Sequence, residues 1–239
     1  MSLSKNHIKL ITSLSQKKYR QKHQLFIVEG VKVVQEFLSS SYDLEILFST
    51  ENDFSFTNKF IKVSGQELKK ISGLKKPNKV LAIFKIPNQI NPKTDGLVLA
   101  LDSINDPGNL GTIIRLCDWF GIEQLVCSNE TVDCFNSKVV QASMGSLTRV
   151  AISYLDLNNY LQNASAPIFI ADMDGLDVYK TKLPDSAVLV LGNEANGISD
   201  GIKKLVTTKI TIPRYGVSQQ TESLNVATAS AILLSEFRR

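Results

Sequence analysis

The sequence is poor in the residues that build disulfides and metal sites. Its 239 residues include three cysteines and two histidines. The cysteines, at 117, 127 and 134, show no C-x-x-C spacing, and the histidines, at 7 and 23, lie far from them in sequence. These features argue against a disulfide framework and against a zinc site, so no metal is expected. A reducing cytoplasm is the compartment that such cysteine usage favours.

Long apolar runs are also absent. No stretch of 18 apolar residues occurs, which argues against a membrane-spanning helix. The segment 1–20 is polar and basic and lacks the apolar core of a secretory signal. Neither a signal peptide nor a membrane span is therefore expected.

Two familiar nucleotide-binding motifs are missing as well. No G-x-G-x-x-G follows the first strand of an α/β pattern, and no G-x-x-x-x-G-K-[ST] is present. The glycines at 108, 111, 192 and 197 lie on different predicted elements. A cofactor is therefore not expected on a Rossmann phosphate turn, and hydrolysis of ATP or GTP has no support.

The charge is unevenly distributed, although the net charge is only +4. Segment 1–24 contains six cations and no acid, and segment 69–79 contains five lysines and no acid. The first set is Lys5, Lys9, Lys17, Lys18, Arg20 and Lys22, and the second is Lys69, Lys70, Lys75, Lys76 and Lys79. Clustered cations of this kind suit a phosphate backbone. A solvated basic face, which is common, is the favoured explanation of either cluster taken alone.

A Pro- and Asn-rich segment at 86–96 predicts a linker, which divides the chain into domains 1–90 and 91–239. The first domain is predicted to be a small α/β unit. Its helices are predicted at 7–18, 30–38 and 66–71, and its strands at 25–28, 44–49 and 80–86.

The second domain alternates apolar runs with helical patterns. Strands are predicted at 97–101, 124–127, 168–171, 187–191 and 209–212, and helices at 108–120, 137–144 and 223–237. This alternation predicts an α/β fold with a mostly parallel sheet and helices on both faces.

Three short motifs place polar side chains in turns that follow apolar runs. Segment 106–115 carries Asn109 and Arg115, segment 191–197 carries Glu194, and segment 223–226 carries Ser223 and Asn225. Turns at the carboxyl ends of strands are where open α/β sheets bind ligands. Taken alone, each motif is also explained by capping or turn chemistry, with Ser223 as the N-cap of the last helix and Asn225 in its first turn.

Together and in this order, the motifs resemble the signature of the SpoU (TrmH-like) RNA methyltransferases of the SPOUT class. A small-residue helix end at 140–146 fits the same pattern. The resemblance implies transfer of a methyl group from S-adenosyl-L-methionine to a ribose 2′-hydroxyl of structured RNA, either rRNA or tRNA. It implies a SPOUT-type parallel sheet with a C-terminal trefoil knot in domain 91–239. Domain 1–90 resembles the ribosomal-protein-like α/β domain that binds RNA substrate, through the segment 26–30.

The resemblance also implies roles for individual residues. The catalytic set is Asn109, Arg115, Glu194, Ser223 and Asn225. Backbone atoms at Leu191, Gly192, Ile212 and Leu224 would hold the cofactor, and Lys17, Lys18, Arg20 and Lys22 would contact RNA. Arg115 would either take the hydroxyl proton or clamp a phosphate. The loop 214–222 is longer than the usual family pattern.

The family forms dimers that complete each active site across the interface, and the small residues at 227–231 permit close helix approach. A homodimer is therefore expected. Two other readings remain open at this point. One is a non-catalytic RNA-binding protein with the same fold, and the other is a metabolic enzyme that uses another adenosine-containing molecule.

Overall fold

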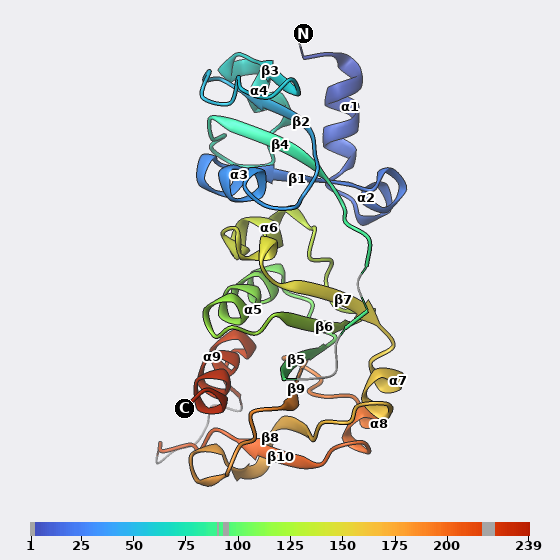
Figure 1. Ribbon diagram of the computed structural model, residues 1–239, viewed down its shortest axis with the longest axis vertical. Helices are drawn as coiled ribbons and strands as arrows, with labels where there is room; N and C mark the ends of the chain where they lie inside the picture. Colours follow the sequence, from blue (N-terminus) through green and yellow to red (C-terminus); the bar gives the residue numbers. More distant parts are fainter. Residues whose placement is uncertain (1–2, 90, 93–95, 217–222) are drawn as a thin grey trace. The chain divides into compact units, whose positions relative to one another are not determined.

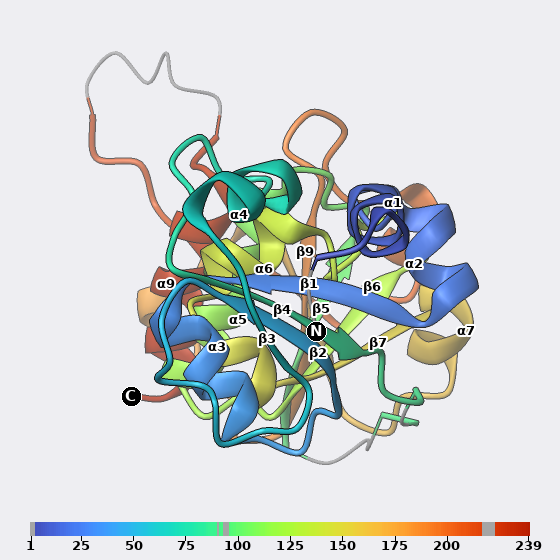
Figure 2. The same cartoon turned by 90° about the horizontal axis from the view of Figure 1, so that it is seen from above.

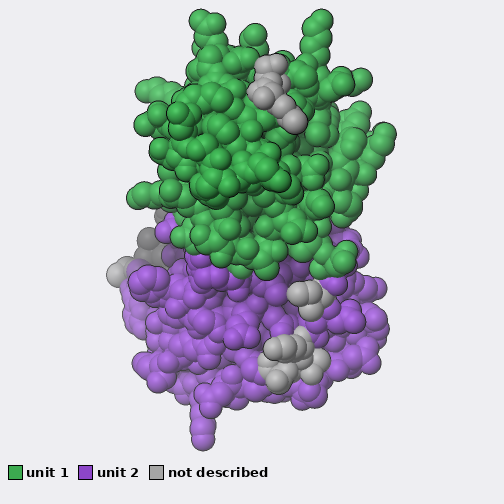
Figure 3. All heavy atoms as spheres, turned by 45° about the horizontal axis from the view of Figure 1, so that its top comes forward, with its two compact units in different colours: residues 1–88, 133–148 green, residues 89–132, 149–239 purple. Residues whose placement is uncertain are grey.

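The computed structural model describes residues 3–89, 91–92, 96–216 and 223–239. The chain divides into two compact units, coloured separately in Figure 3. Unit 1 comprises residues 1–88 and 133–148, and unit 2 comprises residues 89–132 and 149–239. The segment 133–148, which we expected in the second domain, therefore packs with the first.

Unit 1 contains a four-stranded sheet in the order β1-β4-β2-β3. Its strands are β1 (Leu25–Glu29), β2 (Leu44–Ser49), β3 (Phe60–Lys62) and β4 (Val80–Lys85). Strand β4 runs antiparallel to both β1 and β2, and β3 is parallel to β2. The three-residue strand β3 was too short to be predicted from its sequence.

Helices α1 (Lys5–Ser13), α2 (Lys17–His23), α3 (Val31–Leu38) and α4 (Gly65–Ile71) cover the two faces of this sheet (Figures 1 and 2). Helix α6 (Ser137–Ser143) lies against the edge strand β1. Figure 2 shows α1 and α4 on one side of the sheet and α3 on the other. On the α3 side, Phe26 packs against Phe37 and against Phe135, with ring centroids 5.6 and 4.7 Å apart. Phe135 precedes α6, so its ring ties segment 133–148 into the core of unit 1.

The helix predicted at 7–18 is two helices, α1 and α2, because the chain turns at 14–16. Side-chain hydroxyls compete with the helical pattern there: Ser13 Oγ donates to Leu10 O at 2.6 Å, and Ser15 Oγ donates to Thr12 O at 2.7 Å. Leu14 ends α1 as its C-cap and is buried. The turn leaves backbone carbonyls available to accept a side chain from α2.

Unit 2 contains a six-stranded sheet in the order β10-β8-β9-β5-β6-β7. Its strands are β5 (Leu97–Asp102), β6 (Gln124–Ser128), β7 (Ala151–Leu155), β8 (Ile168–Asp177), β9 (Ala187–Gly192) and β10 (Thr208–Thr211). Every neighbouring pair is parallel, which confirms the predicted parallel sheet. The strand order does not decide how the chain is threaded, so the trefoil knot stays a prediction.

Helices cover both faces of the second sheet, as predicted (Figure 1). They are α5 (Pro107–Trp119), α7 (Leu157–Gln162), α8 (Asp200–Lys203) and α9 (Val226–Phe237). Helix α5 packs against α9, and α7 packs against α8. Strands β5 and β9 lie at the centre, and their apolar runs are buried, as expected of strands covered on both sides.

The register of the two central strands places two of the sequence motifs side by side. Asp102, the last residue of β5, is paired with Gly192, the last residue of β9. The turn that leads to Asn109 and the turn that contains Glu194 therefore leave the same edge of the sheet from adjacent strands. No helix in the described part of the chain is long and apolar enough to cross a membrane.

Candidate functional site

Asn109 links the three sequence motifs. Asp106 caps α5 by accepting a hydrogen bond from Asn109 N at 2.8 Å, which fixes Asn109 in the first helical turn. The Asn109 side-chain nitrogen donates to Glu194 Oε1, and its oxygen accepts from Asn225 Nδ2 at 2.9 Å. One amide therefore connects the β5–α5 turn, the loop after β9 and the start of α9.

The N-cap of α9 is Asn225, and the expectation that Ser223 would cap this helix is wrong. Asn225 Oδ1 accepts from Ala227 N at 3.0 Å and from Thr228 N at 3.3 Å, and the helix begins at Val226. Asn225 thus caps α9 with its oxygen and holds Asn109 with its nitrogen. Ser223 lies before the helix and is exposed.

The loop after β9 presents Glu194 at the surface. Asn193 and Gly197 exchange backbone hydrogen bonds of 3.0 and 2.8 Å, which close a tight turn around Glu194. Gly192 lies under this turn, where a Cβ atom would come within 2.5 Å of the Gly197 carbonyl carbon. Glycine is required at 192 because the turn folds back on the strand end.

A cleft of about 470 Å³ opens beside this loop in unit 2. The four residues predicted to hold the cofactor, Leu191, Gly192, Ile212 and Leu224, all line it, and so do Glu194 and Ser223. Its further lining combines apolar side chains with charges of both signs. Those residues include Ile198, Ile210, Val226, Leu233, Asp172, Lys203 and Arg214.

Two charged residues of the cleft lining, Asp172 and Lys203, were not predicted. Lys209 Nζ lies 3.3 Å from Asp172 Oδ2. Burial acts to raise the pKa of Asp172, but the hydrogen bond from Asp174 N and the nearby Lys209 ammonium outweigh it, so this pKa is lower than usual. A negative charge is therefore maintained on this wall at neutral pH, beside the positive charge of Lys203.

Arg115 lies farther along α5 and is not part of the cleft lining. Its side chain is exposed and makes no hydrogen bond or ion pair with any residue that the structure describes. Asn109 does not line the cleft either, but it reaches the lining residue Glu194 directly. Of the five predicted catalytic residues, Asn109, Glu194 and Asn225 form one hydrogen-bonded group. Ser223 lines the cleft, and Arg115 lies apart from both.

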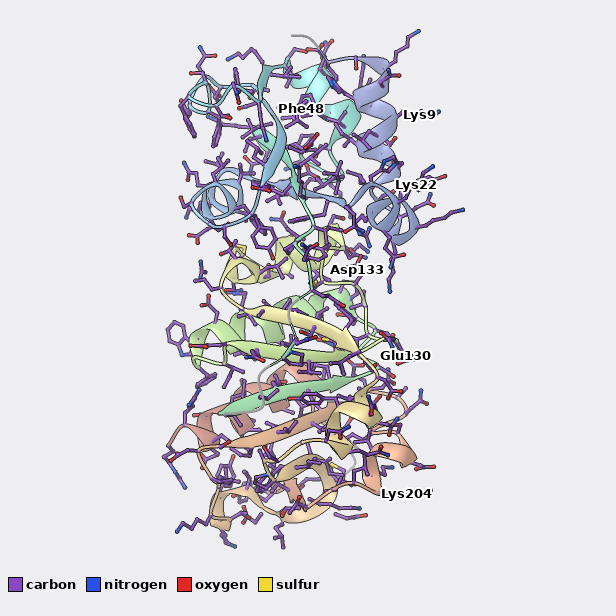
Figure 4. All side chains as sticks on the ribbon, turned by 45° about the vertical axis from the view of Figure 1, so that its right-hand side comes forward. Lys9, Lys22, Phe48, Glu130, Asp133 and Lys204 are labelled. Carbon is purple, nitrogen blue, oxygen red and sulfur yellow. The ribbon has the colours of Figure 1, made fainter. Side chains whose placement is uncertain are left out.

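Of the four residues expected to contact RNA, three are exposed on α2 and one is buried. Lys17, Lys18 and Lys22 are exposed, and Figure 4 shows Lys22 projecting outward. Arg20 is only 2% exposed. Its Nε donates to Asp133 Oδ2 at 2.8 Å, and its Nη1 donates to Leu14 O and Ser15 O at 2.9 and 3.0 Å. In this structure Arg20 is a core ion-pair residue and is not available to a phosphate.

Two further expectations concern the loop 214–222 and a metal site. Arg214 and Gly216 line the cleft, whereas residues 217–222 of the predicted longer loop lie outside the described part of the chain. Within the described residues, no group of three or more His, Cys, Asp or Glu side chains could hold a metal ion.

Comparison with known proteins assigns both parts of the sequence. Residues 96–235 match the SpoU rRNA Methylase family, and residues 5–82 match the MRM3-like substrate binding domain. A 23S rRNA (guanosine(2553)-2′-O)-methyltransferase, RlmP, from Bacillus subtilis is 30% identical over 94% of this chain and 93% of its own length.

Solved structures give the same result. A TrmH-family RNA methyltransferase structure from Porphyromonas gingivalis superposes with a TM-score of 0.92 at 39% identity, covering 100% of this chain and 99% of its own. An AdoMet-bound rRNA methyltransferase from Sinorhizobium meliloti superposes with a TM-score of 0.88 at 28% identity, covering 100% and 96%. The chain belongs to the SpoU rRNA methylase family.

Proposed function

We propose that this chain transfers a methyl group from S-adenosyl-L-methionine to a ribose 2′-hydroxyl of rRNA. The observation that carries the proposal is the Glu194–Asn109–Asn225 connection beside the cleft, because it joins polar groups from three separate motifs at one point. Family membership and the full-length similarity to a protein named for 23S rRNA support the choice of reaction and of RNA class.

The cleft suits the proposed cofactor in its chemistry. An adenosine group needs apolar contacts, and the amino acid end of S-adenosylmethionine carries both an ammonium and a carboxylate. The cleft offers apolar side chains together with Asp172 and Lys203. Its floor at Gly192 has no room for a side chain, so a ligand there would meet backbone atoms. We assign Leu191, Gly192, Ile212 and Leu224 to hold the cofactor through their backbone.

When bound, S-adenosylmethionine supplies a methyl group that its sulfonium already makes electrophilic. The protein's own task is to orient the 2′-hydroxyl and to manage its proton. Asn109 is suited to orientation, because both ends of its amide are engaged and its direction is thereby set. Glu194 and Ser223 would face the ribose from the cleft.

Arg115 has two candidate roles, as a phosphate clamp and as the group that takes the hydroxyl proton. A guanidinium normally stays protonated, and its fork of donors matches a phosphate. Its exposed side chain, without a partner among the described residues, is available for either role. The RNA affinity of the Arg115→Ala variant separates the two roles, because loss of a phosphate clamp weakens RNA binding and loss of a base does not.

We further propose that the active form is a cytoplasmic homodimer of two-fold symmetry. Of the small residues of α9, Ala227 and Ser230 are buried within the single chain, so they serve the packing of α9. Large apolar side chains remain for an interface: Trp119 at the end of α5 is 84% exposed, and Leu176 in β8 is 61% exposed. Sedimentation at micromolar concentration tests this, and a monomer would contradict it.

The reaction is tested by incubating the protein with rRNA and labelled S-adenosylmethionine, followed by alkali. A 2′-O-methyl group removes the internal nucleophile of the linkage, so the label should appear in an alkali-stable dinucleotide. Label released as a mononucleotide would mean methylation of a base. Binding of S-adenosylmethionine, measured by calorimetry, would exclude a protein that only binds RNA. Methyl transfer that requires no RNA would point to a metabolic enzyme.

Two variants connect the reaction to the site. Glu194→Gln and Arg115→Ala should both remain folded, because both side chains are exposed, and both should lose most methyl transfer. Arg115→Ala should keep the cofactor affinity of the unmodified protein, because Arg115 does not line the cleft. Full activity of either variant would contradict the assigned roles.

A further inference from the structure

A buried carboxylate lies directly behind the Glu194 loop. Asp102 is the last residue of β5 and is only 5% exposed. Its Oδ2 accepts from Ser199 N at 2.7 Å, and its Oδ1 accepts from Ser103 Oγ at 3.2 Å. A carboxylate is costly to bury unless its oxygens are hydrogen-bonded, so this position calls for an explanation. None of the roles assigned above uses it.

Ser103 provides a second connection at the same strand end. Its φ is +60°, a left-handed conformation that is uncommon for a residue other than glycine. In this conformation its carbonyl oxygen accepts from Asn193 Nδ2 at 2.8 Å, while its N–H donates to Ser128 Oγ at 3.0 Å. Backbone strain of this kind persists where surrounding contacts maintain it, and it is frequent near functional sites.

The loop 193–199 is therefore closed on itself and hydrogen-bonded at two points to the end of β5, at Asp102 and at the next residue, Ser103. Internally, Asn193 Oδ1 accepts from Ala195 N at 2.9 Å and from Asn196 N at 3.1 Å, which sets the shape of the turn. Externally, one tie runs from Asn193 to Ser103 and the other from Ser199 to Asp102. The internal bonds give the loop its shape, and the ties give it its place on the sheet.

We propose that Asp102 is a positioning residue for methyl transfer. Through Ser199 it holds the loop that carries Glu194 and forms one wall of the cleft, and so it keeps Glu194 within reach of Asn109. Asp102 itself does not line the cleft. The proposal rests on the proposed function, since the geometry it maintains is that of the methyl-transfer site.

Two pairs of variants test the tie from both of its ends. Asp102→Ala removes both acceptors, whereas Asp102→Asn keeps an oxygen for Ser199 N and places an amide next to the Ser103 hydroxyl, which can accept from it. Ser199→Pro removes the donor at a residue whose φ of −62° already suits proline. Ser199→Ala keeps the donor and is the matched control, because the Ser199 hydroxyl makes no capping bond to α8.

A misplacement of about 1 Å can lower a rate by roughly 100-fold. We therefore expect Asp102→Ala and Ser199→Pro to lower kcat by roughly 10- to 100-fold, with the KM for RNA changed less than about twofold. Asp102→Asn should restore most of the activity, and Ser199→Ala should resemble the unmodified protein. The double variant Asp102→Ala, Ser199→Pro should be no worse than Asp102→Ala alone, because the hydrogen bond that Ser199→Pro removes is already absent in Asp102→Ala.

A readout independent of activity is amide hydrogen exchange across 193–199, which should accelerate in Asp102→Ala and in Ser199→Pro only. A folded Asp102→Ala variant with either unchanged exchange or unchanged kcat would overturn the proposal. If Asp102→Ala does not fold, the comparison of Ser199→Pro with Ser199→Ala decides. If the unmodified protein methylates no RNA, the proposed function fails, whereas unchanged loop exchange in the folded variants would refute the positioning role of Asp102 separately.

Discussion

The side-chain nitrogen of Asn225 donates a 2.9 Å hydrogen bond to the side-chain oxygen of Asn109, 116 residues earlier in the chain. The same Asn225 side chain caps α9 through its oxygen. One residue therefore stabilises a helix and also fixes the orientation of an amide at the candidate site. These two contributions can be separated by substitution.

Asn225→Ser should keep the cap, since serine is as good an N-cap as asparagine, but its shorter side chain lacks the amide that reaches Asn109. We expect a nearly unchanged melting temperature and a large loss of methyl transfer. Asn225→Ala should lose both, with a destabilisation of about 0.5–2 kcal/mol. Thermal unfolding and the transfer assay measure the two effects, and an active Asn225→Ser variant would contradict the role of the Asn109 contact.

Gly192→Ala should abolish cofactor binding for a steric reason. The new Cβ would lie 2.5 Å from the Gly197 carbonyl carbon and 2.6 Å from its oxygen, so the turn around Glu194 would have to move. Gly216→Ala is the matched control, because Gly216 lines the same cleft and a Cβ there meets nothing within 4 Å. Calorimetry with S-adenosylmethionine should show loss of binding for the first variant and little change for the second. Equal affinities would show that the turn accommodates the methyl group.

The cations of α2 should separate into two classes. Changing Lys17, Lys18 and Lys22 together to Gln should weaken RNA binding. The slope of log affinity against log salt should become shallower by about 0.7–0.9 for each phosphate that is no longer neutralised. Stability should hardly change, because all three are exposed. An unchanged salt slope would favour a solvated basic face as the explanation of this cluster.

Arg20→Gln should instead destabilise the protein. Removing one partner of a buried ion pair leaves the other charge uncompensated and costs about 3–5 kcal/mol. Here the partner is Asp133, and the side chains are 3% and 13% exposed. Denaturant unfolding measures the effect. A variant of unmodified stability with weakened RNA binding would return Arg20 to the RNA-contacting set.

The three cysteines should be unreactive in the folded protein. All are buried thiols, with exposed fractions of 0%, 0% and 2%. Burial, together with the adjacent Asp118 charge, raises the pKa of the Cys117 thiol, which lowers the amount of reactive thiolate. A disulfide reagent at pH 8 should therefore titrate the thiols only in denaturant, and rapid reaction in native buffer would contradict their burial.

Much of the fold is predictable from the sequence, because strands covered on both faces leave continuous apolar runs. The predicted strands around 97–101 and 187–191 are observed with their ends shifted by one residue. Strand β7 was missed because it lies at the sheet edge, where only one of its five residues is buried and the apolar pattern is broken. Strand β8 extends well beyond its predicted end because it follows β10 through a shift in register.

The parts of the site that were missed depend on distant partners. The sequence suggested Ser223 as the N-cap of α9 and placed Asn225 in its first turn, whereas Asn225 is the N-cap in the structure. Arg20 was taken as exposed because its partner, Asp133, is 113 residues away. Asp102 accepts a hydrogen bond from a backbone N–H that lies 97 residues later in the chain. A contact over this separation cannot be recognised from composition or from motif spacing. A carboxylate that closes a buried apolar strand is the signal that could have drawn attention to it.

The membership of segment 133–148 in unit 1 has a consequence for how the protein is made. Residues 1–88 alone lack Asp133, which neutralises Arg20, and Phe135, which packs on Phe26. As the chain leaves the ribosome, the N-terminal unit therefore stays incomplete until Thr148 has been synthesised, well after the first strands of unit 2. Expression of residues 1–88 as an isolated fragment would leave a buried cation and an aromatic surface without their partners.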